Sequence, residues 1–195
     1  MKKKLRAPLI LASASPRRQL LLSQAGYDFE VVATDIDETA YLSSGIEPGE
    51  YAKLLAKEKA SAVACRRRNT IVIGADTIVY AGGRIIGKAA DDDHAKQIIR
   101  TLFSSPHDVI TGIAILKLDE DIEIVESITT VVYPRMLSEE QIDDHIRKGD
   151  WQGKAGAYGI QETGDEFVER IEGSLTNVMG FPMERITQLL DGRFS

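Results

Sequence analysis

The chain has 195 residues and a formal net charge of −6, with 43% hydrophobic and 28% charged residues. This length predicts one domain over residues 1–195, or two lobes around one core. The negative charge argues against a protein that coats nucleic acid. The single cysteine, Cys65, excludes an internal disulfide and a cysteine-rich zinc site, which fits a cytoplasmic protein.

The N-terminal segment is basic over residues 1–6, but only a short apolar stretch follows, at residues 7–12. That stretch is too short for a signal peptide or a membrane span. No later segment is apolar for the roughly 18 residues that a span requires. We therefore expect no membrane partner.

Strand and helix patterns alternate along the first part of the chain. The apolar run at residues 9–11 predicts a strand, and a helix is expected from about Pro16 to Ala25, where Gly26 can end it. The other expected strands are residues 29–33, 71–80, 84–86, 108–118, 122–133 and 167–171. The other expected helices are residues 48–68, 91–102, 138–149 and a last one opened by Pro182. These patterns predict a mixed α/β fold with long antiparallel hairpins. No G-x-G-x-x-G motif of a dinucleotide-binding fold is present.

The sequence Ser-Ala-Ser-Pro-Arg-Arg at residues 13–18 opens the first helix. Ser15 suits the N-cap and Pro16 the first helical position. Arg17 and Arg18 stand in the first turn, where the helix dipole is already positive, so an anion there would stabilise them. Backbone N–H groups, hydroxyls and two guanidinium groups together suit a phosphate. The alternative is a pair of solvated arginines on a surface helix.

Asp76 interrupts an apolar run that should be buried, residues 71–79. A carboxylate there is costly unless it is paired, bound to a metal or catalytic. The alternative is an aspartate at a bulge, bonded to nearby backbone, which Gly74 would permit. The acidic loop with Asp35, Asp37 and Glu38 is either solvated or supplies a carboxylate that joins Asp76 in holding Mg²⁺.

Several basic residues have an unusual placement. Lys59 falls on the apolar side of its helix, where it either extends to solvent or points at a phosphate. Lys88 follows Gly87 after the predicted hairpin. It is either part of the site or an ordinary surface lysine. The segment 154–161 is dense in small residues; Lys154 could meet a charge and Gln161 a polar edge, or the segment is a tight structural loop. Arginines, lysines, a buried aspartate and an acidic loop are the groups used for metal-assisted attack on a phosphate ester.

Together these motifs resemble one family. They occur in the order seen in Maf proteins, which are nucleoside triphosphate pyrophosphatases sometimes named septum formation proteins. The matching segments are residues 13–18, 74–77, 87–88, 154–161 and 177–182.

The resemblance implies an elongated mixed sheet flanked by helices, related to inosine triphosphate pyrophosphatases, with two lobes around a central cleft. It implies cleavage of a nucleoside triphosphate between the α and β phosphates, a divalent metal cofactor (Mg²⁺ or Mn²⁺), and a homodimer. By the same matching, Asp76 is the catalytic acidic residue and proton acceptor, and Glu38 is an acidic cleft residue that could share the metal with it. Ser13 and Ser15 line the phosphate turn. The basic residues matched to phosphate binding are Arg17, Lys59, Lys88 and Lys154.

The resemblance also implies a branch within the family. Arg18, Thr77 and Gln161 agree with the branch that prefers dTTP and UTP, whereas a branch acting on 7-methyl-GTP carries Trp, Lys and Glu there. A glutamine can donate to and accept from the imide edge of uracil or thymine. The chain departs from the family's usual pattern at Ala89, which is usually proline, and at Gly153, which is usually aspartate.

Two other functions remain open at this point. The first is the same reaction with the task of clearing modified nucleotides. The second is a nucleotide-binding regulator of division or septation, which would bind nucleotide tightly and turn it over negligibly. A nucleic-acid-binding module is disfavoured by the acidic balance and by the lack of an aromatic and basic face.

Overall fold

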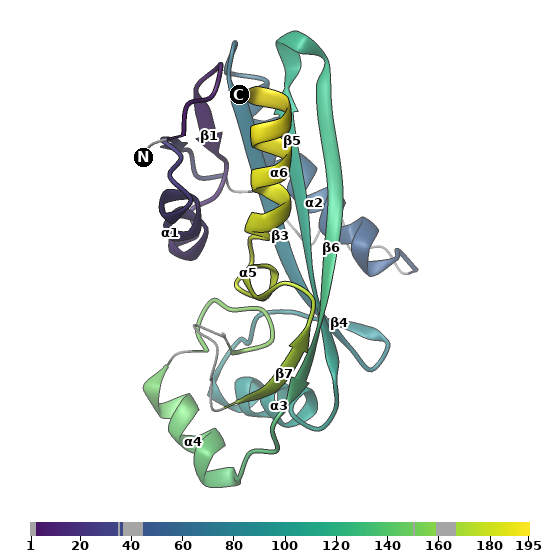
Figure 1. Ribbon diagram of the computed structural model, residues 1–195. Coiled ribbons are helices and arrows are strands. Elements are labelled where there is room, and N and C mark those ends of the chain that lie inside the picture. Colours follow the sequence, from purple (N-terminus) through teal and green to yellow (C-terminus); the bar gives the residue numbers. More distant parts are fainter. Residues whose placement is uncertain (1–2, 35, 37–44, 150, 159–166) are drawn as a thin grey trace.

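A long mixed sheet runs through the molecule, and β5 and β6 extend along most of its length (Figure 1). We describe it from a computed structural model, in residues 3–34, 36, 45–149, 151–158 and 167–195. Over these residues the strand order is β2-β1-β3-β5-β6-β7, and β4 pairs with β3 on the same edge as β1 but further along the strand. The strands are β1 (Leu9–Leu11), β2 (Glu30–Val31), β3 (Ile71–Ala81), β4 (Arg84–Ile86), β5 (His107–Lys117), β6 (Ile122–Pro134) and β7 (Val168–Glu172).

Helices cover both faces of this sheet. They are α1 (Pro16–Gln24), α2 (Pro48–Ala64), α3 (Asp92–Leu102), α4 (Glu139–Lys148), α5 (Leu175–Val178) and α6 (Met183–Phe194). β1 pairs with β2 and β3 in parallel, and the remaining pairs are antiparallel. The predicted mixed α/β class with long hairpins is therefore confirmed. In the described part of the chain, no helix has the length and apolar character to cross a membrane.

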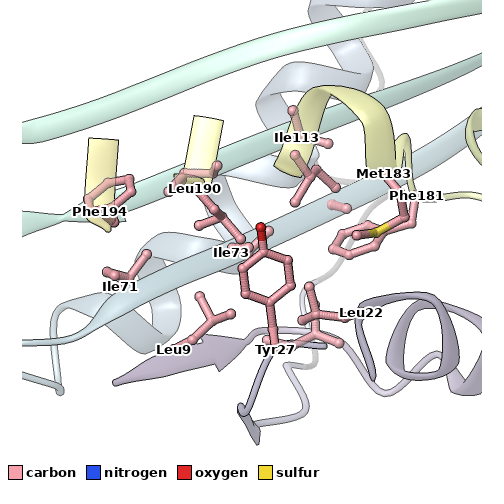
Figure 2. Close-up of a cluster of buried hydrophobic side chains, with 14 of the residues drawn as sticks. Leu9, Leu22, Tyr27, Ile71, Ile73, Ile113, Phe181, Met183, Leu190 and Phe194 are labelled. Carbon is pink, nitrogen blue, oxygen red and sulfur yellow. The ribbon is translucent and has the colours of Figure 1, made fainter. Parts of the chain in front are cut away.

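Alternation along β3 and β5 divides the core between the two faces, because successive side chains point to opposite sides of a strand. Odd-numbered residues such as Ile73 and Ile113 pack under α1 and α6 at one end of the sheet, and Figure 2 shows them pointing toward Tyr27, Phe181 and side chains of α6. On the same face, a second apolar cluster lies at the other end, under α3 and α4. The even-numbered residues pack against α2.

α2 lies close to the sheet because two glycines sit beneath it. A Cβ added at Gly112 of β5 would lie 2.1 Å from the Ala52 carbonyl oxygen, and one at Gly74 of β3 would lie 2.3 Å from the Ala56 carbonyl oxygen. Only glycine permits so close a backbone approach. This contact sets the position of Lys59, one turn further along α2.

The largest differences from the predicted boundaries are in two elements, and one short helix was not predicted. The helix predicted for residues 48–68 ends at Ala64, with Cys65 as its C-cap, so residues 66–68 lie outside it. The strand predicted for residues 29–33 is limited to Glu30–Val31, because its neighbour β1 is itself only three residues long. α5 was not predicted, since four residues are too few to carry a helical period.

Candidate active site

The sheet has a gap at its centre, on the edge of β3. β1 pairs with Ile71–Ile73 and β4 with Val79–Ala81 on the same side of β3. Between them, within the described part of the chain, residues 74–78 have a strand neighbour on the β5 side alone. A cavity of about 180 Å³ opens at this gap.

Residues from both ends of the sheet line the cavity. Those that the sequence had singled out are Ser15, Arg17, Arg18, Lys59, Asp76, Thr77 and Lys88. The others include Tyr158, Met179 and Gly180, from segments far along the chain. A second, mostly apolar cavity of about 240 Å³ lies on the α2 side, and Asp76, Thr77 and Lys88 line it as well. Asp76 therefore lies where two cavities meet.

Asp76 forms an ion pair with Lys59. The Lys59 Nζ lies 2.5 Å from Asp76 Oδ1, and the two side chains are 12% and 10% exposed. The register of β3 on β5 continues unbroken through Asp76, so the aspartate does not sit at a bulge. Lys59 is turned toward the carboxylate and does not extend to solvent. Since a charge that loses its partner in such a buried place is costly, each group stabilises the other here.

Arg18 connects three parts of the chain. Its guanidinium donates to the Ala75 carbonyl at 2.7 Å, the Gly180 carbonyl at 2.9 Å and the Thr77 hydroxyl at 3.1 Å. It also donates to the hydroxyl of Ser13, which is buried behind it and does not line the cavity. In this structure Arg18 holds α1 to β3 and to the loop before α6.

Arg17 differs from its neighbour. It lines the cavity half-buried, and its guanidinium makes no hydrogen bond or ion pair within the described ranges. Burial lowers the pKa of Arg17, although the group stays charged at neutral pH. Lys88 is exposed at the rim. These two cations suit a negatively charged ligand.

Replacing Arg18 by lysine should destabilise the protein, because one ammonium group cannot reach all the acceptors that the fork reaches. We expect Arg18→Lys to lower the free energy of unfolding by about 2–4 kcal/mol. Arg17→Lys is the matched control and should change it by less than about 0.5 kcal/mol. Urea denaturation of both variants measures the difference. Equal stability of the two variants would show that the Arg18 contacts do not stabilise the fold.

Besides Ser13, three predicted site residues are not placed in the cavity. Lys154 is half-buried and does not line it, although its neighbours Gly153 and Ala155 do. Glu38 and Gln161 lie outside the described residues, as do the acidic-loop residues Asp35 and Asp37. Across the described ranges, no group of three or more His, Cys, Asp or Glu side chains is placed to hold a metal ion.

The two apolar clusters beside the cavity are separated by a polar seam of hydrogen-bonded residues, Thr77, Thr111, Thr130 and Asn177. The sequence did not predict this seam. The buried Asn177 donates from Nδ2 to the Val109 carbonyl and to the Thr130 hydroxyl, both at 3.0 Å. Thr111 donates to the Asn177 carbonyl and bonds to the Thr77 hydroxyl. The seam fixes Thr77 and the loop of Met179 and Gly180. Asn177 lies in the matching segment 177–182, but no role was predicted for it.

The chain is similar over nearly its whole length to proteins of one kind. The family described as Maf-like protein matches residues 8–193. A dTTP/UTP pyrophosphatase of Geotalea uraniireducens (strain Rf4) is 43% identical over 182 residues, covering 93% of both chains. One of Pelotomaculum thermopropionicum is 38% identical, covering 93% of this chain and 94% of that protein.

Two solved structures are also similar, at 13% identity and a TM-score of 0.42 each. They are a HAM1 protein from Coxiella burnetii, covering 94% of this chain, and the Staphylococcus aureus Ham1 protein, covering 96%. In both cases 91% of the other chain is covered.

Proposed function

The chain belongs to the Maf family, and we propose that it is a nucleoside triphosphate pyrophosphatase acting on dTTP and UTP. The products are the nucleoside monophosphate and pyrophosphate. The observation that carries the proposal is the buried Asp76–Lys59 pair in a cavity that Arg17 and Lys88 also line. One carboxylate surrounded by cations suits a polyanionic substrate that must be attacked by water.

The position of Asp76 fits a substrate with two chemically different ends. Two cavities meet at this residue, of about 180 and 240 Å³, and only the first is lined by Arg17 and Arg18. A nucleoside triphosphate is larger than either cavity and can extend past Asp76. The bond to be broken then lies within reach of the carboxylate.

In the proposed reaction a water molecule attacks the α-phosphorus in line with the leaving group. The water oxygen forms a bond to phosphorus, the bond to the α–β bridging oxygen breaks, and its electron pair leaves with pyrophosphate. Asp76 accepts the proton of the water. The arriving phosphates compete with Asp76 for the Lys59 ammonium, which frees the carboxylate for this role. Arg17, Lys88 and Lys154 neutralise the charge of the phosphates.

A divalent cation, Mg²⁺ or Mn²⁺, suits the Asp76 carboxylate together with the phosphates of the substrate. Magnesium is commonly held by one or two carboxylates together with substrate phosphates and water, so it does not need a cage of protein ligands. Asp76 with Glu38 would hold the ion. When bound, it would polarise the phosphoryl oxygens and offset their charge.

Pyrophosphate release tests this function directly. The substrates are dTTP, UTP, CTP, 7-methyl-GTP and the purine triphosphates, each with and without Mg²⁺ or Mn²⁺. Metal-dependent release from dTTP and UTP is the expected result. Faster turnover of 7-methyl-GTP or of another modified nucleotide would favour a clearing role. Tight binding without turnover would overturn the enzyme assignment in favour of a regulatory protein.

Gln161→Glu should shift the substrate preference. A glutamate at this position loses the amide donor that would pair with the imide carbonyl of thymine or uracil, and it suits a cationic methylated guanine better. We expect kcat/KM for dTTP to fall at least about tenfold relative to that for 7-methyl-GTP. An unchanged ratio would contradict the role of Gln161 in reading the base.

A further inference from the structure

Two buried histidines outside the cavity hold one of its walls. That wall is the loop of residues 151–158, of which Gly153, Ala155 and Tyr158 line the cavity. His145 of α4 and His107 of β5 are 7% and 3% exposed, and each bonds to the C-terminal end of this loop. They reach it from two different elements.

His145 bonds to the loop backbone. Its Nε2 lies 3.0 Å from the Ala157 carbonyl oxygen. Because a carbonyl can only accept, Nε2 carries the proton and donates it. The ring also packs edge-on against Phe167, with 5.2 Å between centroids.

His107 bonds to a side chain of the loop. Its Nδ1 lies 3.1 Å from the Leu102 carbonyl oxygen, so Nδ1 carries the proton. Its Nε2 is then an acceptor for the Tyr158 hydroxyl, at 2.6 Å. Burial lowers the pKa of His107, which keeps the ring neutral and able to accept.

The loop conformation requires this support. Ala157 has a φ of 56°, in the left-handed region that a residue with a Cβ disfavours, and Gly153 and Gly156 are left-handed as well. Such conformations persist where the surroundings hold them. The Ala157 carbonyl, held by His145, belongs to this strained residue.

The loop is also bonded to the segment that contains Gly87 and Lys88. The Gly156 amide donates to the Gly87 carbonyl at 3.2 Å, and Ala155 forms a bridge with Lys88. A shift of the loop therefore moves both Tyr158 and the cation at the rim.

We propose that His145 and His107 are positioning residues that hold the 151–158 loop in the shape that binds nucleotide. This inference rests on the proposed function for the identity of the ligand. Asp76 and Lys59 are positioned by separate contacts between β3 and α2. Loosening the loop should therefore weaken substrate binding much more than it slows the chemical step.

Matched variants of His145 test this. His145→Phe keeps an aromatic ring against Phe167 and removes the donor, whereas His145→Gln keeps a terminal N–H donor. His94→Phe makes the same replacement on an exposed histidine of α3. We expect His145→Phe to raise KM for dTTP and UTP, and to speed amide hydrogen exchange in residues 151–158 of the nucleotide-free protein, by about three- to tenfold. His145→Gln and His94→Phe should stay close to wild type.

Tyr158→Phe keeps the ring and removes only the hydroxyl that His107 accepts, so it decides the question if His145→Phe does not fold. It should also raise KM and speed exchange in the loop. The inference is overturned if both readouts stay at the wild-type value, if kcat falls while KM does not change, or if His145→Gln behaves like His145→Phe. If the wild type releases no pyrophosphate, the proposed function fails, but hydrogen exchange still decides whether the histidines hold the loop.

Discussion

Asp76→Asn should lower kcat for dTTP and UTP by about 10²–10⁴-fold, the usual contribution of a positioned acid or base. The amide cannot accept the proton of the attacking water, and it is a poorer ligand for a divalent cation. The protein should still fold, because the amide oxygen can accept the hydrogen bond that Lys59 Nζ now gives to Asp76 Oδ1. Steady-state pyrophosphate release at saturating substrate measures the loss.

Two controls separate this loss from unfolding. Asp121→Asn makes the same change in an exposed turn, at a φ of 54° that asparagine adopts readily, and it should keep wild-type activity. Thermal unfolding of Asp76→Asn should remain a single cooperative transition. A folded Asp76→Asn variant with turnover near wild type would contradict the assignment of Asp76.

Gly112→Ala should cause the largest loss of stability, at least about 3 kcal/mol, at the upper end of the range for overpacked cores. The new Cβ would lie 2.1 Å from the Ala52 carbonyl oxygen and 2.6 Å from the Lys53 amide nitrogen, both in the backbone of α2. A helix backbone cannot yield by rotating a side chain, so α2 must move as a whole. Because α2 carries Lys59, activity should fall as well.

Gly192→Ala is the matched control for this prediction. Gly192 lies in α6, and a Cβ there would meet nothing within 4 Å. Since alanine favours the helix over glycine, we expect a gain of about 0.5–1 kcal/mol. Urea denaturation of both variants gives the comparison. If Gly112→Ala is as stable as wild type, α2 does not lie as close to the sheet as described.

The buried strand β3 was predictable because its signal is local. A continuous apolar run predicts a strand covered on both faces, and the structure buries it under α2 on one side and under α1 and α6 on the other. The same run made Asp76 stand out, since a carboxylate in such a place needs a partner. Lys59 was singled out for its position on the apolar side of its helix, but its pairing with Asp76 was not predicted.

The different roles of Arg17 and Arg18 could not be predicted from their shared motif. The partners of Arg18 include Gly180 and Thr77, which lie 162 and 59 residues away along the chain. No local pattern encodes such contacts. For the same reason no role could be predicted for His107, which meets Tyr158 across 51 residues. The roles of Glu38, Lys154 and Gln161 stay predictions.

In the proposed mechanism, this cavity directs water to the α-phosphorus of dTTP or UTP. Hydrolysis of dTTP in ¹⁸O-labelled water with Mg²⁺, followed by mass spectrometry of both products, tests it most directly. We expect dTMP that carries one ¹⁸O atom, together with unlabelled pyrophosphate. Label in the pyrophosphate, or products dTDP and orthophosphate, would contradict it.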